Sequence, residues 1–156
     1  MINVAIPDFG ALELEHLVLD FNGTLAVDGE LLPGVAERLV ALAPRLSIHV
    51  LTGDTHGTAA RSLESLPCSL AVAPPSDQGE AKRRFVEALG AEHVVAIGNG
   101  RNDRLMLKAA RLGIVVLQRE GAAAETLAAA DVIVPAIEDA LDLLAHPLRL
   151  VASLRD

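Results

Sequence analysis

The sequence predicts a three-layer α/β sandwich built around a mainly parallel β-sheet. Short apolar runs alternate along the chain with segments whose apolar residues recur at helical spacing. Three of these runs, at 17–19, 46–51 and 93–97, stop at or just before small, polar or acidic residues. Alternating strands and helices imply parallel strands joined by right-handed crossovers, so the three ends would meet at one edge of the sheet. We therefore expect one Rossmann-like domain over residues 1–156.

The N-terminal segment is predicted to hold two strands and a small flap. Ile2–Ile6 alternates in polarity and is expected to form an extra edge strand before Pro7. His16–Asp20 is expected to form a strand covered on both faces, because its middle residues are continuously apolar. Asp28 and Gly29 separate two short apolar runs, which is typical of a tight hairpin turn. The hairpin would form a flap directly after Asp20.

The remaining elements alternate in the order that a parallel sheet requires. In the centre the pattern predicts a helix at 33–43, a strand at 46–51, a helix capped by Thr55 that ends before Pro67, a strand at 69–73, and a helix at 78–89 stopped by Gly90. In the C-terminal part it predicts a strand at 93–97, a helix at 102–112, a strand at 114–117, a helix at 122–130, a strand at 132–134 and a helix at 137–144.

Composition excludes several classes of protein. Hydrophobic residues make up 51% of the 156, which is enough for a sizeable core in one domain. The net charge of −8 argues against a nucleic-acid partner, whose phosphates attract basic surfaces. Cys68 is the single cysteine, so an intramolecular disulfide is impossible. Because no secretory signal and no membrane-length apolar run is seen, we expect a cytoplasmic protein without a membrane partner.

Asp20 is the first candidate catalytic residue. It ends a buried strand, and in open α/β sheets ligands bind beyond the carboxyl ends of strands. A carboxylate placed there can act as a nucleophile, although an Asp that only caps a turn would give the same local pattern. Asp103 offers a second carboxylate and Asn99 an amide oxygen, both after the 93–97 strand. Asp103 also fits an acid at a helix N-terminus.

Four short motifs occur in order between Asp20 and Asp103. They are Asp20-Phe21-Asn22-Gly23-Thr24, Thr52 within Leu-Thr-Gly-Asp, Lys82, and Gly98-Asn99-Gly100-Arg101-Asn102-Asp103. With these motifs the chain resembles the haloacid dehalogenase-like (HAD) hydrolase superfamily. In particular, it resembles the small soluble proteins related to the phosphorylation domain of P-type ATPases. Lys82 is the best match to the third motif, but Arg83 and Arg84 stand beside it, which leaves open which cation reaches the site.

The spacing of the motifs leaves no room for a cap domain. Members of the superfamily often carry a substrate-covering cap between the first two motifs or after the third. Here 27 residues lie between Thr24 and Thr52, and about 30 between Thr52 and Lys82. We therefore expect an open site. An open site favours a macromolecular substrate or a homo-oligomer in which another subunit covers the site.

The resemblance implies a Mg²⁺-dependent phosphohydrolase that works through an aspartyl-phosphate at Asp20. Screening the repulsion between a carboxylate and a phosphate requires a cation, and Mg²⁺ prefers oxygen ligands. The expected metal ligands are Asp20, the backbone carbonyl of Asn22, Asn99 and Asp103. The expected phosphate contacts are the Thr52 hydroxyl, the Lys82 ammonium, the backbone amides of Gly23, Thr24 and Gly53, and Asn102 as a supporting residue. Thr52 also fits a helix-entry residue, and Asn102 a helix cap.

Two residues depart from the phosphatase pattern. Phosphatases of the superfamily usually have an Asp at the position of Asn22, and an amide can neither protonate a leaving group nor activate water. The pattern also usually has Asp where this chain has Asn99. We therefore expect slow turnover and weak Mg²⁺ binding. The alternative is a catalytically weak or inactive phosphate- or protein-binding module. Hydrolysis of carbon–halogen or phosphonate bonds ranks lower, because those activities usually come with a cap.

Overall fold

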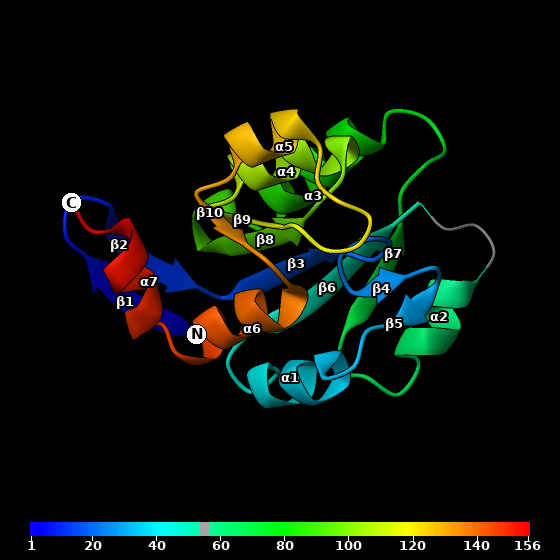
Figure 1. Cartoon of the computed structure of the whole chain (residues 1–156), viewed down its shortest axis with the longest axis horizontal. Coiled ribbons are helices and arrows are strands. Elements are labelled where there is room, and N and C mark those ends of the chain that lie inside the picture. The colour runs from blue at the N-terminus through cyan, green and yellow to red at the C-terminus, as the bar shows by residue number, and fades with distance from the viewer. Residues whose placement is uncertain (54–56) are drawn as a thin grey trace.

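The computed structural model describes residues 1–53 and 57–156. Its centre is a six-stranded sheet with the strand order β10-β9-β8-β3-β6-β7 (Figure 1). All neighbouring strands in this sheet pair in parallel. The strands are β3 (His16–Asp20), β6 (Ser47–Thr52), β7 (Ser69–Val72), β8 (Val94–Gly98), β9 (Leu112–Val116) and β10 (Val132–Val134). The predicted parallel α/β architecture is confirmed.

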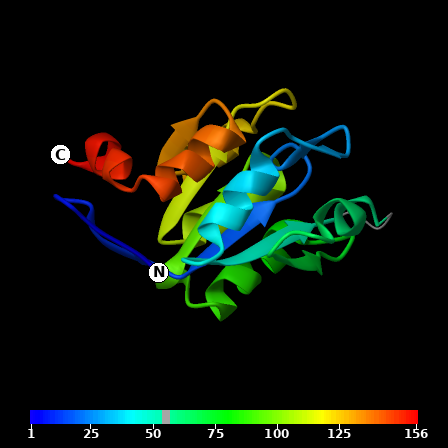
Figure 2. The same ribbon diagram turned by 90° about the horizontal axis from the view of Figure 1, so that it is seen from below.

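Helices cover both faces of this sheet and complete the three layers. One face carries α3 (Gln78–Ala88), α4 (Arg104–Ala109) and α5 (Ala124–Ala129), and the other carries α1 (Val35–Leu42), α2 (Thr58–Leu63) and α6 (Ile137–Ala145) (Figure 1). Figure 2, seen from below, shows α1 and α6 lying side by side over the sheet. Among the described residues there is no cap domain over the carboxyl ends of the strands, and no helix is long and apolar enough to cross a membrane.

Strand β3 is buried on both faces because successive side chains point to opposite sides of the sheet. Leu17 and Leu19 belong to the larger apolar cluster, which also holds residues of α1 and α6. Val18 belongs to a second cluster with residues of α3 and α4, such as Val86 and Met106. The continuous apolar run that precedes Asp20 therefore fixes the middle strand of the fold, and Asp20 ends it at the open edge.

Two small antiparallel sheets flank the central one. Strand β1 (Ile2–Ile6) forms as predicted, but it pairs with β2 (Gly10–Leu14), a strand that the sequence analysis missed, and not with the central sheet. Strands β4 (Ala26–Val27) and β5 (Glu30–Leu31) form the predicted flap, with left-handed backbone at Asp28 and Gly29.

Several boundaries differ from the prediction. The helix predicted at 102–112 divides into a 3-10 turn, η2 (Arg101–Asp103), and α4, which ends at Ala109 because β9 begins at Leu112. Another 3-10 turn, η1 (Ala91–His93), precedes β8, and an unpredicted helix α7 (Leu148–Leu154) packs against β1. The expected cap at Thr55 lies outside the described residues.

Candidate active site

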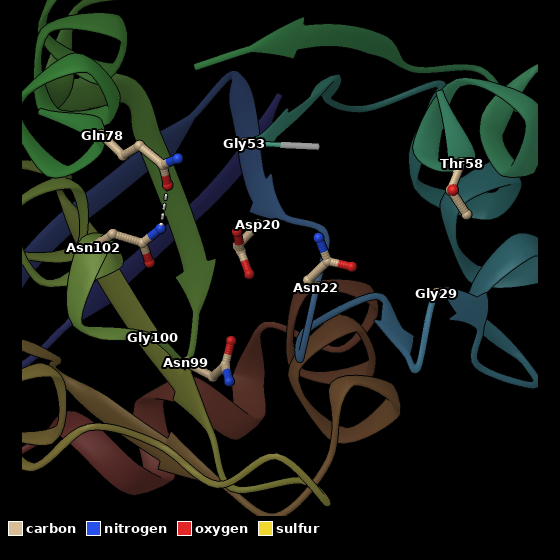
Figure 3. Close-up of a pocket in the computed structure, with 9 residues that line it drawn as sticks. All are labelled: Asp20, Asn22, Gly29, Gly53, Thr58, Gln78, Asn99, Gly100 and Asn102. Carbon is tan, nitrogen blue, oxygen red and sulfur yellow. Dashed lines mark hydrogen bonds between the residues drawn. The ribbon is translucent and has the colours of Figure 1, made fainter. Parts of the chain in front are cut away.

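The three polar strand ends meet at the carboxyl edge of the sheet. Strand β3 lies between β6 and β8, with Asp20 paired to Leu51 and Leu19 paired to Ile97. The residues that follow these positions, Thr52 and Asn99, therefore flank Asp20 as the parallel arrangement predicts. An open cavity of about 380 Å³ lies at this edge (Figure 3). It is lined by Asp20, Asn22, Gly29, Gly53, Thr58, Gln78, Asn99, Gly100 and Asn102.

Lys82 is the cation that reaches Asp20. Its Nζ lies 2.6 Å from Asp20 Oδ1 and 2.6 Å from Asp103 Oδ1, and the lysine side chain is only 1% exposed. Arg83 instead pairs with Glu80 and Glu87 on the outer side of α3, and Arg84 with Glu80. The structure thus selects Lys82 from the three neighbouring cations that the sequence left open.

The helical period places Lys82 beneath the cavity. Lys82 and Val86 are four residues apart on α3, and both are buried against the sheet. The lysine stem follows the apolar face of the helix while its ammonium reaches the strand ends, as long amphipathic side chains can do. The buried face of α3 therefore delivers one positive charge to the base of the site.

The buried cluster holds more negative than positive charge. Burial and the nearby charge of Asp103 raise the pKa of Asp20 to about 7, although Lys82 and Thr24 lower it. Burial opposes the charge on Lys82, but Asp20 and Asp103 outweigh this effect and raise the lysine pKa. Two carboxylates therefore share one ammonium, and a proton or another cation near Asp20 would balance the excess.

Asp103 lies beneath the cavity and does not line it. Its side chain is completely buried. One oxygen, Oδ1, contacts Lys82, and Oδ2 accepts hydrogen bonds from the backbone N–H groups of Asn99 at 3.0 Å and Gly100 at 2.9 Å. A Cβ at Gly98 would lie 2.6 Å from Asp103 Cγ, so a glycine is required for this approach. Both oxygens of Asp103 thus hold Lys82 and the loop, and the expectation that Asp103 is a direct metal ligand stays a prediction.

Asn99 turns its amide oxygen toward Asp20. The Thr24 hydroxyl lies 3.3 Å from Asp20 Oδ2 and 3.2 Å from Asn99 Oδ1. The other end of the amide, Nδ2, donates to the Gly121 carbonyl at 2.9 Å. This second contact fixes which end of the side chain faces the cavity (Figure 3).

The backbone amides of the turn after Asp20 form hydrogen bonds within the turn. The Gly23 N–H donates to the Ala26 carbonyl at 2.7 Å, and the Thr24 N–H to the Phe21 carbonyl at 3.2 Å. Gly23 has a φ of +81°, which a side chain would disfavour. Both amides therefore stabilise the turn itself, and the expectation that they bind phosphate stays a prediction.

Two glutamines of the site were not identified from the sequence. Gln118 Nε2 donates to the carbonyls of Gly23 at 3.0 Å and Thr24 at 2.7 Å, while its Oε1 accepts from the Ile137 N–H at 2.8 Å. It therefore ties the turn after Asp20 to the start of α6. Gln78, the first residue of α3, lines the cavity itself. Neither belongs to a motif, so only the fold reveals them.

The cavity offers few oxygen ligands for a metal ion. In the described part of the chain, no three His, Cys, Asp or Glu side chains come together as a metal-binding group. The Asp20 carboxylate, the Asn99 amide and Asn22 do line the cavity. Mg²⁺ is usually held by one or two carboxylates, and waters and substrate phosphate complete its shell. The donor chemistry therefore fits Mg²⁺ that binds together with a phosphorylated ligand.

A model of the haloacid dehalogenase-like hydrolase family matches residues 2–111. The chain belongs to this family. It is 48% identical over 80 residues to the uncharacterized protein MJ0073 of Methanocaldococcus jannaschii, a match that spans 49% of this chain and 86% of that protein. A shorter match, to MJ0072 of the same organism, is 49% identical over 39 residues, or 25% of this chain and 89% of that protein.

Solved structures of HAD phosphatases and hydrolases share the fold. A HAD superfamily (subfamily III A) hydrolase from Legionella pneumophila superposes with a TM-score of 0.73 at 17% identity, covering 91% of this chain and 87% of that one. The cobalt-bound deoxy-D-mannose-octulosonate 8-phosphate phosphatase of Haemophilus influenzae gives 0.72 at 14% identity, with 90% and 92% covered. The 3-deoxy-D-manno-octulosonate 8-phosphate phosphatase of Moraxella catarrhalis, solved in complex with a magnesium ion, a phosphate ion and a KDO molecule, gives 0.67 at 18% identity, with 90% of both chains covered.

Proposed function

We propose that this protein is a Mg²⁺-dependent phosphohydrolase that forms an aspartyl-phosphate at Asp20. The observation that carries the proposal is the buried Lys82 bridge beneath a carboxylate that opens onto a polar cavity. One oxygen of Asp20 is held by Lys82, and the other lies toward Thr24. Membership of a hydrolase family supports a hydrolytic reaction, and the likeness to HAD phosphatases supports phosphate as its target.

The reaction would proceed in two displacements. In the first, a carboxylate oxygen of Asp20 forms a bond to phosphorus, and the bond from phosphorus to the leaving oxygen breaks. That oxygen keeps the electron pair. In the second, water attacks phosphorus, which releases inorganic phosphate, regenerates the carboxylate and passes the water proton to solvent. Burial raises the pKa of Asp20, and because only its ionised form is nucleophilic, the reaction requires Asp20 to be deprotonated.

Protein groups around Asp20 would bind the phosphoryl oxygens. We assign this role to the Thr52 hydroxyl, the Gly53 amide and Lys82, which the sequence also predicted. Mg²⁺ held by Asp20, Asn99 and the main-chain carbonyl of Asn22 would supply positive charge beside the phosphoryl group. Asp103 would act indirectly, by holding Lys82 in place. The further resemblance to the ATPase phosphorylation domain stays a prediction.

Asn22 sets the kind of substrate that reacts well. It lines the cavity where an acid would be needed to protonate a leaving group. Phosphates with good leaving groups, such as acetyl phosphate and p-nitrophenyl phosphate, should therefore react faster than alkyl phosphates. General acid–base assistance is worth roughly 10²–10⁴-fold, so Asn22→Asp should raise alkyl-phosphate turnover by at least about tenfold.

The direct test is phosphate release from p-nitrophenyl phosphate with and without Mg²⁺. Asp20→Asn should abolish this activity while the circular dichroism spectrum stays that of the parent protein. Retained turnover in pure Asp20→Asn protein would contradict the assignment of the nucleophile.

The neutral side chains at positions 22 and 99 favour a second candidate, a phosphate- or protein-binding module on the same fold. In that case phosphate would bind, as measured by calorimetry, but the parent protein would release none from any of these esters. An Asn22→Asp and Asn99→Asp double variant that gained Mg²⁺-dependent turnover would then identify the two amides as the cause.

A further inference from the structure

Two amide side chains form a joined wall on one side of the cavity. Asn102 Nδ2 donates to Gln78 Oε1 at 2.9 Å, which links the first residue of α3 to the η2 turn (Figure 3). Both residues line the same cavity as Asp20. The wall therefore faces the space that a leaving group would occupy once a phosphoryl group lies against Asp20.

The joined pair keeps one donor and one acceptor for a ligand. Within the described chain, the bond to Asn102 uses Gln78 Oε1, so Gln78 Nε2 remains a donor and Asn102 Oδ1 an acceptor. Nε2 packs against Gly53, where a Cβ would lie 2.4 Å from it, and Oδ1 packs against Gly100, where a Cβ would lie 2.8 Å away. If the nitrogen and oxygen of both side-chain amides exchanged places, the pair would still offer one donor and one acceptor.

The backbone before Gln78 is held in an unusual conformation. Asp77 has a φ of +62°, in the left-handed region that non-glycine residues rarely adopt. Such a conformation costs free energy and is often found beside functional groups. Here it starts α3 at the residue whose side chain forms the wall.

We propose that the Gln78–Asn102 pair determines substrate specificity by binding a hydroxyl group of the leaving group. This inference rests on the proposed phosphohydrolase function. A hydroxyl can donate or accept, so it can bind at the free nitrogen of Gln78 or at the free oxygen of Asn102. A carboxylate or a second phosphate offers only hydrogen-bond acceptors. It would therefore place one oxygen against another at the amide oxygen of Asn102. Asp20 is the only charged residue in the cavity lining formed by the described residues, which also favours an uncharged, hydroxylated leaving group.

Competition against p-nitrophenyl phosphate turnover by the intact protein tests this proposal. Three competitors of similar size are used: glycerol 3-phosphate, propyl phosphate, which lacks hydroxyls, and 3-phosphoglycerate, which keeps one hydroxyl but has a carboxylate in place of the other. One net hydrogen bond corresponds to roughly fivefold in affinity and two to roughly thirtyfold, so glycerol 3-phosphate should compete at least about tenfold better than propyl phosphate. It should also compete better than 3-phosphoglycerate.

The ratio of inhibition constants within each protein is the readout, so a general loss of activity does not affect it. Gln78→Met and, separately, Asn102→Leu should reduce the glycerol-to-propyl ratio to within about twofold of one. Glu87→Leu, on the outer side of α3, should keep the parent ratio. Equal inhibition constants in an active parent protein would overturn the specificity role and leave the phosphohydrolase proposal intact. No turnover of p-nitrophenyl phosphate would overturn both.

Discussion

The inner and outer sides of helix α3 carry the same kinds of charge in very different surroundings. On the inner side, Lys82 is 1% exposed and lies 2.6 Å from each of two buried carboxylates. On the outer side, Arg83 and Arg84 pair with glutamates of the same helix, and the Arg83 side chain is 36% exposed. Residues that are adjacent in sequence therefore experience water on one side and protein on the other.

This difference indicates which ion pairs contribute to the stability of the fold. Charges in water interact weakly because solvent and salt screen them. Charges inside the protein have lost their hydration, so each depends on its partner, and removing one leaves the others uncompensated. The inner cluster is also unbalanced, since Asp20 and Asp103 share a single lysine. This imbalance makes the site costly to fold and ready to accept a cation.

The largest expected effect is that of Lys82→Met, which keeps the shape of the stem but removes the charge. Asp20 and Asp103 would then repel each other without a partner. Breaking a buried ion pair from one side costs about 3–5 kcal/mol, and we expect a loss of that order in the free energy of unfolding at pH 7.5. Urea denaturation measures it. The outer variant Arg84→Met is the control and should unfold at the parent midpoint; a comparable loss in both would erase the distinction between the two sides.

Asp20→Asn should raise the free energy of unfolding at high pH, whereas Lys82→Met should lower it. Folding raises the pKa of Asp20 from 3.8 to about 7, so the folded protein binds this proton more tightly than the unfolded chain does. That contribution to stability is complete below pH 4 and is lost as pH rises through 7. Above pH 7 the parent therefore carries a cost that the neutral amide avoids. We expect Asp20→Asn to be more stable at pH 8, by on the order of 1–2 kcal/mol, and this gain to shrink toward pH 4.

Metal-free urea denaturation at a series of pH values from 4 to 8 measures this gain. A difference between parent and Asp20→Asn that stayed constant over the series would show that the titration of Asp20 is not its source. Thr24→Val is a useful companion, because it removes a contact to Asp20 but adds no change of charge.

The convergence of the site could be predicted from the sequence because it depends on the parallel direction of the strands. Apolar runs ended at Asp20, Thr52 and before Asn99, and parallel pairing had to bring these ends together. Strand β2 and helix α7 were missed although both left signals. Leu12 and Leu14 alternate with Glu13 after a glycine, and Pro147 precedes apolar residues at helical spacing.

The direction of individual side chains could not be predicted in the same way. The spacing of Asp103 suits a metal ligand and a partner of Lys82 equally well. In the structure the backbone amides of Asn99 and Gly100 bind its second oxygen, a contact that the spacing alone does not reveal. Gln118 and Gln78 come from a loop and a helix start without any motif. Their roles arise from which turns the fold brings together, and that information lies in tertiary packing.

The smallest effect is expected on the outer side of α3, for Glu80→Gln. The guanidinium of Arg83 lowers the pKa of the Glu80 carboxyl, so this pair adds stability above the usual pKa of a glutamate and loses it as the carboxylate is protonated in acid. Both side chains are in contact with water, so screening should leave the unfolding midpoint at the parent value in 150 mM salt, within the error of the measurement. Only in low salt near neutral pH should a small loss emerge, and it should disappear as the Glu80 carboxyl is protonated in acid. A loss of stability that did not depend on salt would show that Glu80 has a structural role beyond its ion pair. The charges on the outer side of α3 would then contribute to stability more as those on the inner side do.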